Sequence, residues 1–165
     1  MSERRALVLT VSDGAAAGAR DDESGRALAA RLTELGFAVS QRVVPDEPEL
    51  IAVAVSEATE SIDLVIATGG TGLGPRDRTP QALRGLLDYE IPGFGEVMRA
   101  GGRYSTPLAD LSRSLGGVLG STLVVAVPGS PRGAIESLAA IEPLLEHALE
   151  TLGGHTQHTA RPAGP

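Results

Sequence analysis

Apolar residues along this chain fall in short unbroken runs separated by polar segments. Residues 6–11, 64–67 and 123–127 are continuous runs rich in Val, Ile, Leu and Ala. Such runs are typical of strands that are buried on both faces of a sheet. A further strand is predicted over residues 37–44.

The segments between these runs repeat their apolar positions at helical spacing. Helices are predicted over residues 23–35, with Gly36 just past the end, and from Asp46 to about Glu60, where the spacing of Asp46 and Glu49 resembles a capping box. Thr79-Pro80 resembles an N-cap with proline at the first helical position, so a short helix should run to Leu87. Two more helices are predicted, one over residues 93–99 and one carrying Leu138, Ile141, Leu145, Leu149 and Leu152, which Pro143 should kink or split.

The alternation of strands and helices predicts a single three-layer α/β domain. Its sheet should be mostly parallel, with helices on both faces, and ligands in such sheets bind at the carboxyl ends of the strands. Residues 1–154 form this domain, and the sequence shows no repeat and no second domain. Residues 155–165 carry no apolar pattern and are expected to be a mobile tail.

Composition narrows the classes of partner. A net charge of −7 without any basic run argues against nucleic acid, so a small-molecule ligand is expected. No stretch approaches the roughly 20 apolar residues of a membrane span, and MSERRALVLT lacks the pattern of a signal peptide, so we expect a cytoplasmic protein without a membrane partner. The chain has no Cys, and all 14 basic residues are Arg. A phosphate must therefore be held by backbone N–H groups, Arg or a metal.

The loop after the third apolar run is rich in glycine. Glycines at positions 69, 70, 72 and 74 let the backbone approach a ligand and present N–H groups to an anion. The loop lacks the GK[ST] of a Walker A motif, and Pro75 fails the Rossmann pattern. It is either an anion cradle or a structural turn.

Two carboxylates are candidate functional groups beside this loop. Asp77 would repel a phosphate unless a divalent cation lay between them, so Mg²⁺ is expected there. Asp46 follows the second predicted strand and could serve metal or proton handling at the same edge of the sheet. The alternatives are structural: a turn or cap residue for Asp77 and an N-cap for Asp46.

Other polar residues near the predicted strand ends are candidates for holding a second anionic group. Ser112 and Arg113 precede the last predicted strand, and Ser130 follows it in Pro128-Gly129-Ser130-Pro131, although any of these could belong to an ordinary loop. This loop does not match GxSxG, which excludes a serine hydrolase of that kind. Arg76 and Arg78 are either phosphate contacts or solvated, and a metal site at His155 and His158 is a weak alternative.

Four linked motifs carry a resemblance to a known family. They are Thr68-Gly69-Gly70-Thr71-Gly72 with Arg76-Asp77-x-Thr79-Pro80, Pro92-Gly93-x-x-Glu96-x-x-Arg99, Leu111-Ser112-Arg113, and Pro128-Gly129-Ser130-Pro131. In this order they resemble the MoaB/Mog family of molybdenum cofactor biosynthesis proteins, and the likeness extends through Gly154. Ser12-Asp13 and Asp22-x-Ser24-Gly25 resemble the first loop of the family, but Ala15-Ala16-Ala17 replaces its more polar residues.

The resemblance implies Mg-ATP-dependent adenylylation of molybdopterin, which gives adenylyl-molybdopterin and pyrophosphate. It also implies a homotrimer, and a downstream molybdenum-insertion protein as partner. Asp77 and Asp46 would be the functional carboxylates, with Asp77 as a Mg²⁺ ligand. The implied nucleotide- and pterin-binding residues are Ser12, Gly69, Gly70, Thr71, Gly72, Ser112, Arg113, Gly129 and Ser130. The related insertion proteins carry extra domains that this chain lacks, which favours the adenylylation step.

Two alternatives to the enzyme stay open from the sequence. A carrier paralogue would bind molybdopterin through the same loops without catalysis, and an oligomeric scaffold would keep only a vestigial pocket. Retained Asp77 and Asp46 favour the enzyme. The sequence does not distinguish molybdenum from tungsten as the physiological metal.

Overall fold

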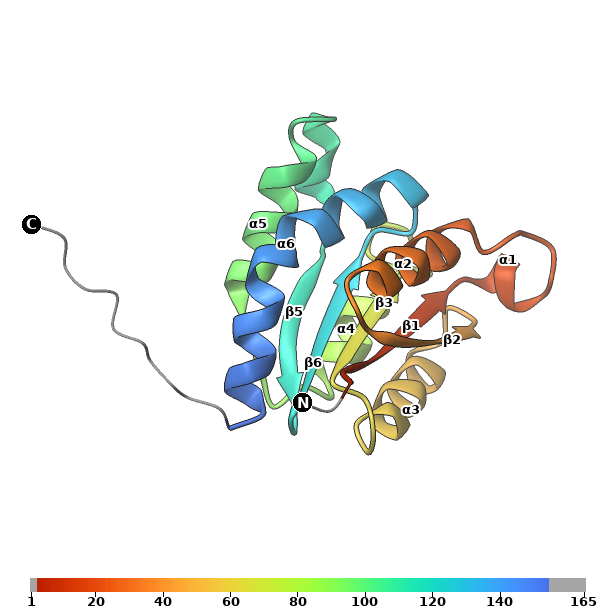
Figure 1. The fold of residues 1–165 in the computed structure, drawn as a ribbon. Helices are drawn as coiled ribbons and strands as arrows, with labels where there is room; N and C mark the ends of the chain where they lie inside the picture. The colour runs from red at the N-terminus through yellow and green to blue at the C-terminus, as the bar shows by residue number, and fades with distance from the viewer. Residues whose placement is uncertain (1–2, 155–165) are drawn as a thin grey trace, which may run out of the picture.

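A computed structural model describes residues 3–154 and contains one six-stranded sheet (Figure 1). The strand order is β2-β1-β3-β6-β5-β4. The first four strands in this order are parallel, whereas β5 and β4 are antiparallel to their neighbours. The strands are β1 (Arg5–Val11), β2 (Ala38–Val44), β3 (Leu64–Thr68), β4 (Tyr89–Glu90), β5 (Leu115–Leu119) and β6 (Thr122–Val127).

Helices cover both faces of the sheet, which confirms the predicted three layers. One core lies between the sheet and α2, α5 and α6, and the other lies between the sheet and α3 and α4. The helices are α1 (Asp13–Ala16), α2 (Glu23–Glu34), α3 (Pro48–Ala58), α4 (Thr79–Arg84), α5 (Pro92–Gly102), the 3₁₀ helix η1 (Pro107–Leu111) and α6 (Pro131–Leu152).

The central strands are buried on both faces, as their unbroken apolar runs predicted. In β1, Ala6 and Val8 face one core, and Leu7 and Leu9 face the other. Because successive strand side chains point to opposite faces, a run without polar residues fills both cores at once.

The prediction missed the antiparallel extension of the sheet formed by β5 and β4. The β5 segment contains Gly116 and Gly117, which weaken the strand pattern. Both glycines are needed in the fold: a Cβ at Gly116 would lie 2.6 Å from the Phe94 ring, and one at Gly117 would lie 2.6 Å from the Tyr89 carbonyl oxygen. The short α1 and η1 were also not predicted.

Two predicted helix starts were wrong in detail. The N-cap of α3 is Glu47, whose side chain makes no capping hydrogen bond, so Asp46 and Glu49 form no capping box. The N-cap of α4 is Arg78, and Thr79 is the first residue of the helix. Asp46 and Thr79 instead bond to loops at the site described below, which explains why capping rules misplaced them.

The helix α6 runs unbroken through Pro143, so the predicted split does not occur. Its ribbon changes direction along its length (Figure 1), as a proline inside a helix produces. Ile141 and Leu145 on either side of Pro143 are both buried in the core. Packing therefore keeps the helix continuous.

The chain reverses its winding between β1 and β3. After β1 it runs to α2 on one face, and after β3 it runs to α4 on the other. This divergence leaves a crevice at the carboxyl ends of the strands, where doubly wound sheets bind ligands. Within residues 3–154 no helix is long and apolar enough to cross a membrane. The predicted tail, with His155 and His158, lies outside the described residues.

Candidate functional site

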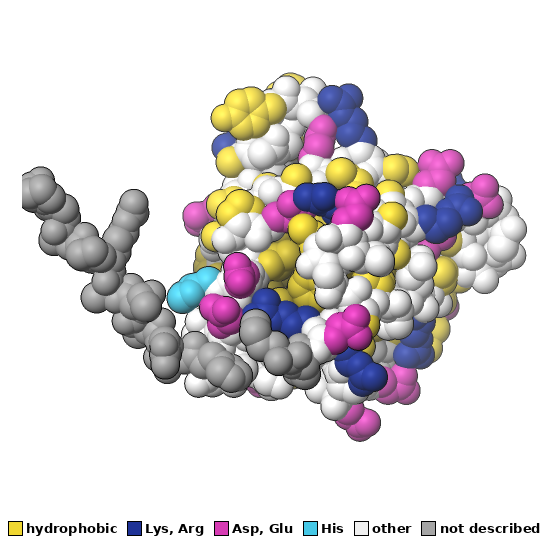
Figure 2. Space-filling view, viewed as in Figure 1, with side chains coloured by type: hydrophobic (Ala, Val, Ile, Leu, Met, Phe, Trp, Pro, Cys, Tyr) yellow, Lys and Arg dark blue, Asp and Glu magenta, His cyan; other side chains and the backbone are white. Residues whose placement is uncertain are grey.

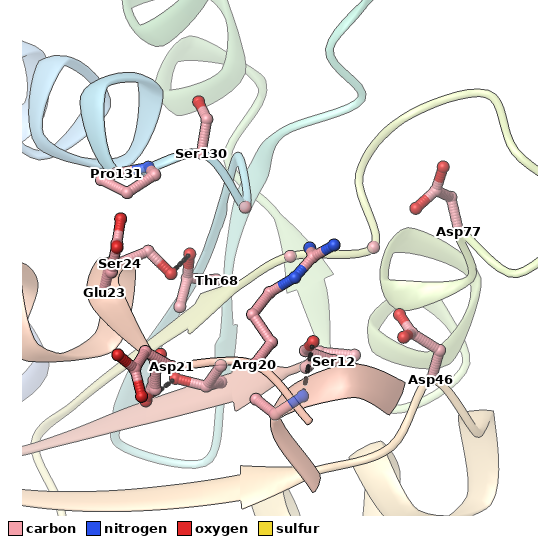
Figure 3. Close-up of a pocket in the computed structure, with 17 residues that line it drawn as sticks. Ser12, Arg20, Asp21, Glu23, Ser24, Asp46, Thr68, Asp77, Ser130 and Pro131 are labelled. Atoms are coloured by element: carbon pink, nitrogen blue, oxygen red, sulfur yellow. Dashed lines mark hydrogen bonds between the residues drawn. The ribbon is translucent and has the colours of Figure 1, made fainter. Parts of the chain in front are cut away.

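A cavity of about 730 Å³ occupies this crevice (Figure 3). The loops after β1, β2, β3 and β6 all reach it, so the four parallel strands each contribute to one site. Its walls include five carboxylates and one basic side chain, that of Arg20. The cavity is lined by Thr10, Val11, Ser12, Ala15, Arg20, Asp21, Asp22, Glu23, Ser24, Asp46, Thr68, Gly69, Gly70, Asp77, Gly129, Ser130 and Pro131.

The turn after β3 requires glycine at two successive positions. Gly69 and Gly70 have φ values of 105° and 66°, a region that other residues rarely enter. A Cβ at Gly69 would lie 2.2 Å from the Val11 carbonyl oxygen, so the turn packs directly on the end of β1. The buried Thr79 hydroxyl donates a hydrogen bond to the Gly69 carbonyl at 2.8 Å, and the Thr79 N–H donates to the Gly70 carbonyl at 3.1 Å. The loop is therefore a fixed structure.

The two glycine-containing loops meet, as their positions after parallel strands predicted. The Gly69 N–H donates to the Val127 carbonyl at 3.1 Å, and a Cβ on Gly129 would lie 3.1 Å from the Cα of Gly69. The Thr68 hydroxyl donates to the Pro128 carbonyl at 2.8 Å and lies 3.2 Å from the Ser24 hydroxyl. The backbones after β3 and β6 thus form one continuous floor.

Asp77 closes the glycine loop on itself. Its Oδ2 accepts a hydrogen bond from the Gly74 N–H at 2.8 Å, and its own N–H donates to the Gly74 carbonyl at 3.0 Å. A Cβ at Gly72 or Gly74 would come within 3 Å of that carboxylate oxygen. The structural role considered for Asp77, a turn, is therefore present. Its Oδ1 has no hydrogen bond within the described chain, which leaves one oxygen for a ligand.

Asp46 lies on the same side of the cavity as Asp77 in Figure 3. Its Oδ2 accepts from the Asp13 N–H at 2.8 Å, and Asp13 Oδ1 accepts from the Asp46 N–H at 3.0 Å. Burial raises the pKa of Asp46, and repulsion from Asp13 and Asp77 adds to this rise. Asp13 is held ionised instead, because its hydrogen bonds from Arg76 at 2.8 and 2.9 Å lower its pKa. Arg76 is thus paired with Asp13, although its side chain stays 59% exposed.

The carboxylates of Asp46 and Asp77 are of the ligand type that Mg²⁺ prefers. A cation between the two carboxylates would relieve the repulsion that raises the pKa of Asp46. Residues 3–154 contain no group of three or more His, Asp or Glu side chains placed to hold a metal. The chain therefore offers two carboxylates, and phosphate and water oxygens would complete the shell, as is usual for Mg²⁺.

Three predicted binding residues hold the backbone with their side chains. Ser12 caps α1 by accepting from the Ala15 N–H at 3.2 Å, and Ser130 caps α6 by accepting from the Gly133 N–H at 3.1 Å. Arg113 lies outside the large cavity, and its Nε donates to the Gly72 carbonyl at 2.9 Å. Arg113 thus braces the glycine loop from behind.

A second hollow of about 440 Å³ adjoins the large cavity. It is lined by Thr71, Gly72 and Ser112, together with the exposed leucines Leu73, Leu108 and Leu111. Gly70, Asp77 and Gly129 line both hollows. Apart from Arg113, the predicted residues therefore divide into one set around the large cavity, one set around the smaller hollow, and a shared boundary.

Sequence reasoning did not single out Thr10 or Arg20 as functional residues. The Thr10 hydroxyl donates to Asp22 Oδ2 at 2.8 Å, while Asp22 Oδ1 accepts from the Gly25 N–H at 2.9 Å and caps α2. The Asp22-x-Ser24-Gly25 motif was the available signal for this corner. Arg20 had no signal, since it follows a stretch of Ala and Gly without periodicity.

Comparisons with known proteins identify relatives of this chain. The family described as "Probable molybdopterin binding domain" matches residues 7–147. A molybdenum cofactor biosynthesis bifunctional protein of Synechococcus elongatus is 42% identical over 158 residues, which cover 94% of this chain and 50% of that protein. A molybdopterin adenylyltransferase of Helicobacter pylori is 34% identical over 153 residues, which cover 90% of this chain and 87% of the relative. The crystal structure of the molybdopterin biosynthesis enzyme MoaB from Thermus thermophilus superposes with a TM-score of 0.83 at 45% identity, covering 92% of this chain and 97% of that one.

This chain spans about half the length of the bifunctional relatives that it matches. The span matched by the family, residues 7–147, contains every residue that lines the two hollows. The similarity therefore covers the whole site.

Proposed function

The chain belongs to the MoaB/Mog family of molybdopterin-binding proteins, and on that premise we propose that it adenylylates molybdopterin with Mg-ATP. A terminal phosphate oxygen of molybdopterin attacks the α-phosphorus of ATP. The bond from this phosphorus to the oxygen that bridges to the β-phosphate breaks, and pyrophosphate leaves. The product is adenylyl-molybdopterin.

The observation that carries this proposal is the meeting of two hollows at Gly70, Asp77 and Gly129. A transferase with two substrates must hold both reacting phosphates at one point. We assign the nucleotide to the 730 Å³ cavity and the pterin to the 440 Å³ hollow. The reacting atoms then lie at the shared boundary, beside the glycine turn.

The residues of the site would act mainly by positioning and charge neutralisation, which suffice for phosphoryl-type transfer. The fixed turn at Gly69 and Gly70 brings backbone close to the ligand. Asp46 and Asp77 would hold Mg²⁺, which supplies neutralisation of the phosphate charge. Ser112 in the smaller hollow offers a hydroxyl, which lies 2.8 Å from that of Ser114, for the pterin side. No lysine is required.

The test is formation of the adenylylated pterin, detected by mass spectrometry after incubation with molybdopterin, ATP and Mg²⁺. We expect Asp77→Asn to lower the rate at least about 100-fold, because the amide cannot neutralise a cation. The amide oxygen can still accept the Gly74 hydrogen bond, so the fold should persist. Asp88→Asn is the matched control, since Asp88 is also an accessible carboxylate that accepts from a glycine N–H, that of Gly120 at 2.8 Å. Equal rates for the two variants would remove Asp77 from the mechanism, and tight pterin binding without product would identify a carrier.

We also propose a homotrimer. Exposed apolar side chains lie at the tip formed by α5 and η1, where Tyr104 is 96% exposed and Leu108 is 67% exposed. Figure 2 shows apolar side chains on this tip beside acidic and basic ones. A second subunit would cover this surface. Sedimentation equilibrium should give a trimer for the unmodified chain and smaller species for Tyr104→Glu; a monomeric unmodified chain would contradict this. The cytoplasmic location and the molybdenum-insertion partner stay predictions from the sequence.

A further inference from the structure

Arg20 differs in charge from the other side chains that line the large cavity. It is the one basic side chain among the lining residues, which also include five carboxylates: Asp21, Asp22, Glu23, Asp46 and Asp77. Figure 3 shows it reaching into the space between Asp21 on one side and Asp46 and Asp77 on the other. Within the described chain, Arg20 makes neither a salt bridge nor a side-chain hydrogen bond, although five carboxylates line the same cavity.

Three arginines that adjoin residues of the two hollows already have partners. Arg76 pairs with Asp13, and Arg113 donates to the carbonyl oxygens of the glycine loop. Arg99 donates to the Ser112 and Ser114 carbonyls at 3.3 and 3.1 Å. Among these four arginines, Arg20 is therefore the one whose guanidinium remains available to an anion.

The backbone of Arg20 is held in place although its side chain is exposed. Its N–H donates to the Gly14 carbonyl at 3.2 Å, next to a bond from Ala19 to the same oxygen at 2.9 Å. Gly14 lies in α1, which Ser12 caps and which is tied to the β2–α3 loop through Asp13 and Asp46. A Cβ at Gly14 would lie 3.4 Å from that of Arg20, so the two backbones are close. The origin of the arginine side chain is thus fixed relative to Asp46.

We propose that Arg20 binds the phosphate oxygens of the nucleotide in the large cavity. This inference rests on the proposed function, because it takes the nucleotide as the occupant. Asp22, two residues after Arg20, already accepts hydrogen bonds on both oxygens, from Thr10 and Gly25, which makes it a weaker ion-pair partner. A triphosphate presents paired oxygens that match the fork of a guanidinium. Arg20 also supplies positive charge where the wall would otherwise be wholly acidic.

The location of Arg20 assigns it to the nucleotide and not to the pterin. Arg20 lines the 730 Å³ cavity and does not line the 440 Å³ hollow. A contact to phosphate also differs from stacking on the adenine base. A phosphate contact affects ligands in proportion to their negative charge, whereas stacking affects adenosine and ATP alike.

Isothermal titration calorimetry of the full chain with Mg²⁺ and adenosine, AMP, ADP or ATP tests this assignment. Arg20→Ala should raise the Kd of ATP about tenfold, as expected for loss of a charge-assisted hydrogen bond, and leave that of adenosine unchanged. Arg20→Lys should recover part of the loss. Arg42→Ala is the control, because Arg42 is an exposed arginine paired with Glu57 outside the cavity, and it should bind ATP as the unmodified chain does.

Three outcomes would overturn the inference. An equal loss for adenosine and ATP would assign Arg20 to the base. An unchanged Kd for ATP in Arg20→Ala, while the unmodified chain forms adenylylated pterin, would remove Arg20 and leave the proposed function standing. An unmodified chain that binds molybdopterin but no nucleotide would overturn both.

Discussion

At the scale of single side chains, Asp46 lies where its ionised form is disfavoured, and it also has a proposed role as a metal ligand. Burial, followed by the nearby charges of Asp13 and Asp77, raises its pKa in the folded protein. The folded state therefore holds this proton more tightly than the unfolded chain, whose Asp pKa is about 3.9. Between the two pKa values the free energy of unfolding falls as pH rises, and the penalty is fully present at neutral pH.

We therefore expect Asp46→Asn to be slightly more stable than the unmodified chain at pH 7, by less than about 1 kcal/mol because the group is only partly buried. The amide oxygen can still accept the Asp13 hydrogen bond. The difference in unfolding free energy should vanish as pH falls toward about 3.5, where the carboxyl is increasingly protonated in both states. The variant should also lose adenylyl transfer. Urea unfolding at both pH values, with Asp88→Asn alongside, measures this effect; a destabilised variant at pH 7 would contradict it.

Thr79 is the second residue on which the site depends, because of its hydroxyl group. It is fully buried and donates to the Gly69 carbonyl at 2.8 Å. Thr79→Val has a similar shape but leaves that carbonyl without the donor, which should cost about 1–3 kcal/mol of unfolding free energy. Thr79→Ser keeps the hydroxyl and is the matched control. Chemical denaturation should separate the two variants, and equal stabilities would show that the turn does not rely on this bond.

At the scale of elements, the junction between β3 and α4 sets the shape of the site. Gly69 has φ of 105° and sits against the Val11 carbonyl, whereas Gly18 has φ of 71° with nothing within 4 Å of an added Cβ. Substitution of either glycine would place a side chain on a backbone with positive φ. Only at Gly69 would the added Cβ also collide with a neighbouring atom.

Gly69→Ala should therefore cost about 3 kcal/mol or more, and Gly18→Ala about 1 kcal/mol. The difference between their unfolding free energies reports the contact between β3 and β1. If the two variants lose equal stability, close packing of the turn on β1 is not what requires glycine at position 69.

The same elements show which structures sequence can predict. β1, β3 and β6 were predicted because burial on both faces leaves an unbroken apolar run. β5 was missed because its glycines are required by the Phe94 ring and the β4 backbone, which are contacts distant in sequence. The meeting of Asp46, Asp77 and the glycine loops was predicted, since all follow strands and parallel strands end at one edge. The role of Arg20 could not be predicted from the sequence, because it depends on which partners the other arginines bind in the fold.

At the scale of the whole molecule, ligand binding and folding are coupled through the four strand ends that form the cavity. A nucleotide that binds only the folded state at 100 times its Kd adds about 2.7 kcal/mol to the free energy of unfolding. Five carboxylates line the cavity against one arginine, so ATP without a divalent cation should bind poorly. Mg-ATP should therefore raise the Tm by several degrees, and ATP with EDTA by much less.

The outcomes of this thermal scan separate the three hypotheses for the chain. A rise that requires Mg²⁺ and is lost in Asp77→Asn is expected of the transferase, because the cation must link phosphate to carboxylate. A rise with molybdopterin alone would indicate a carrier. A Tm that neither ligand moves would indicate a scaffold, since a cavity built from four strand ends cannot bind its ligand without stabilising the sheet that forms it.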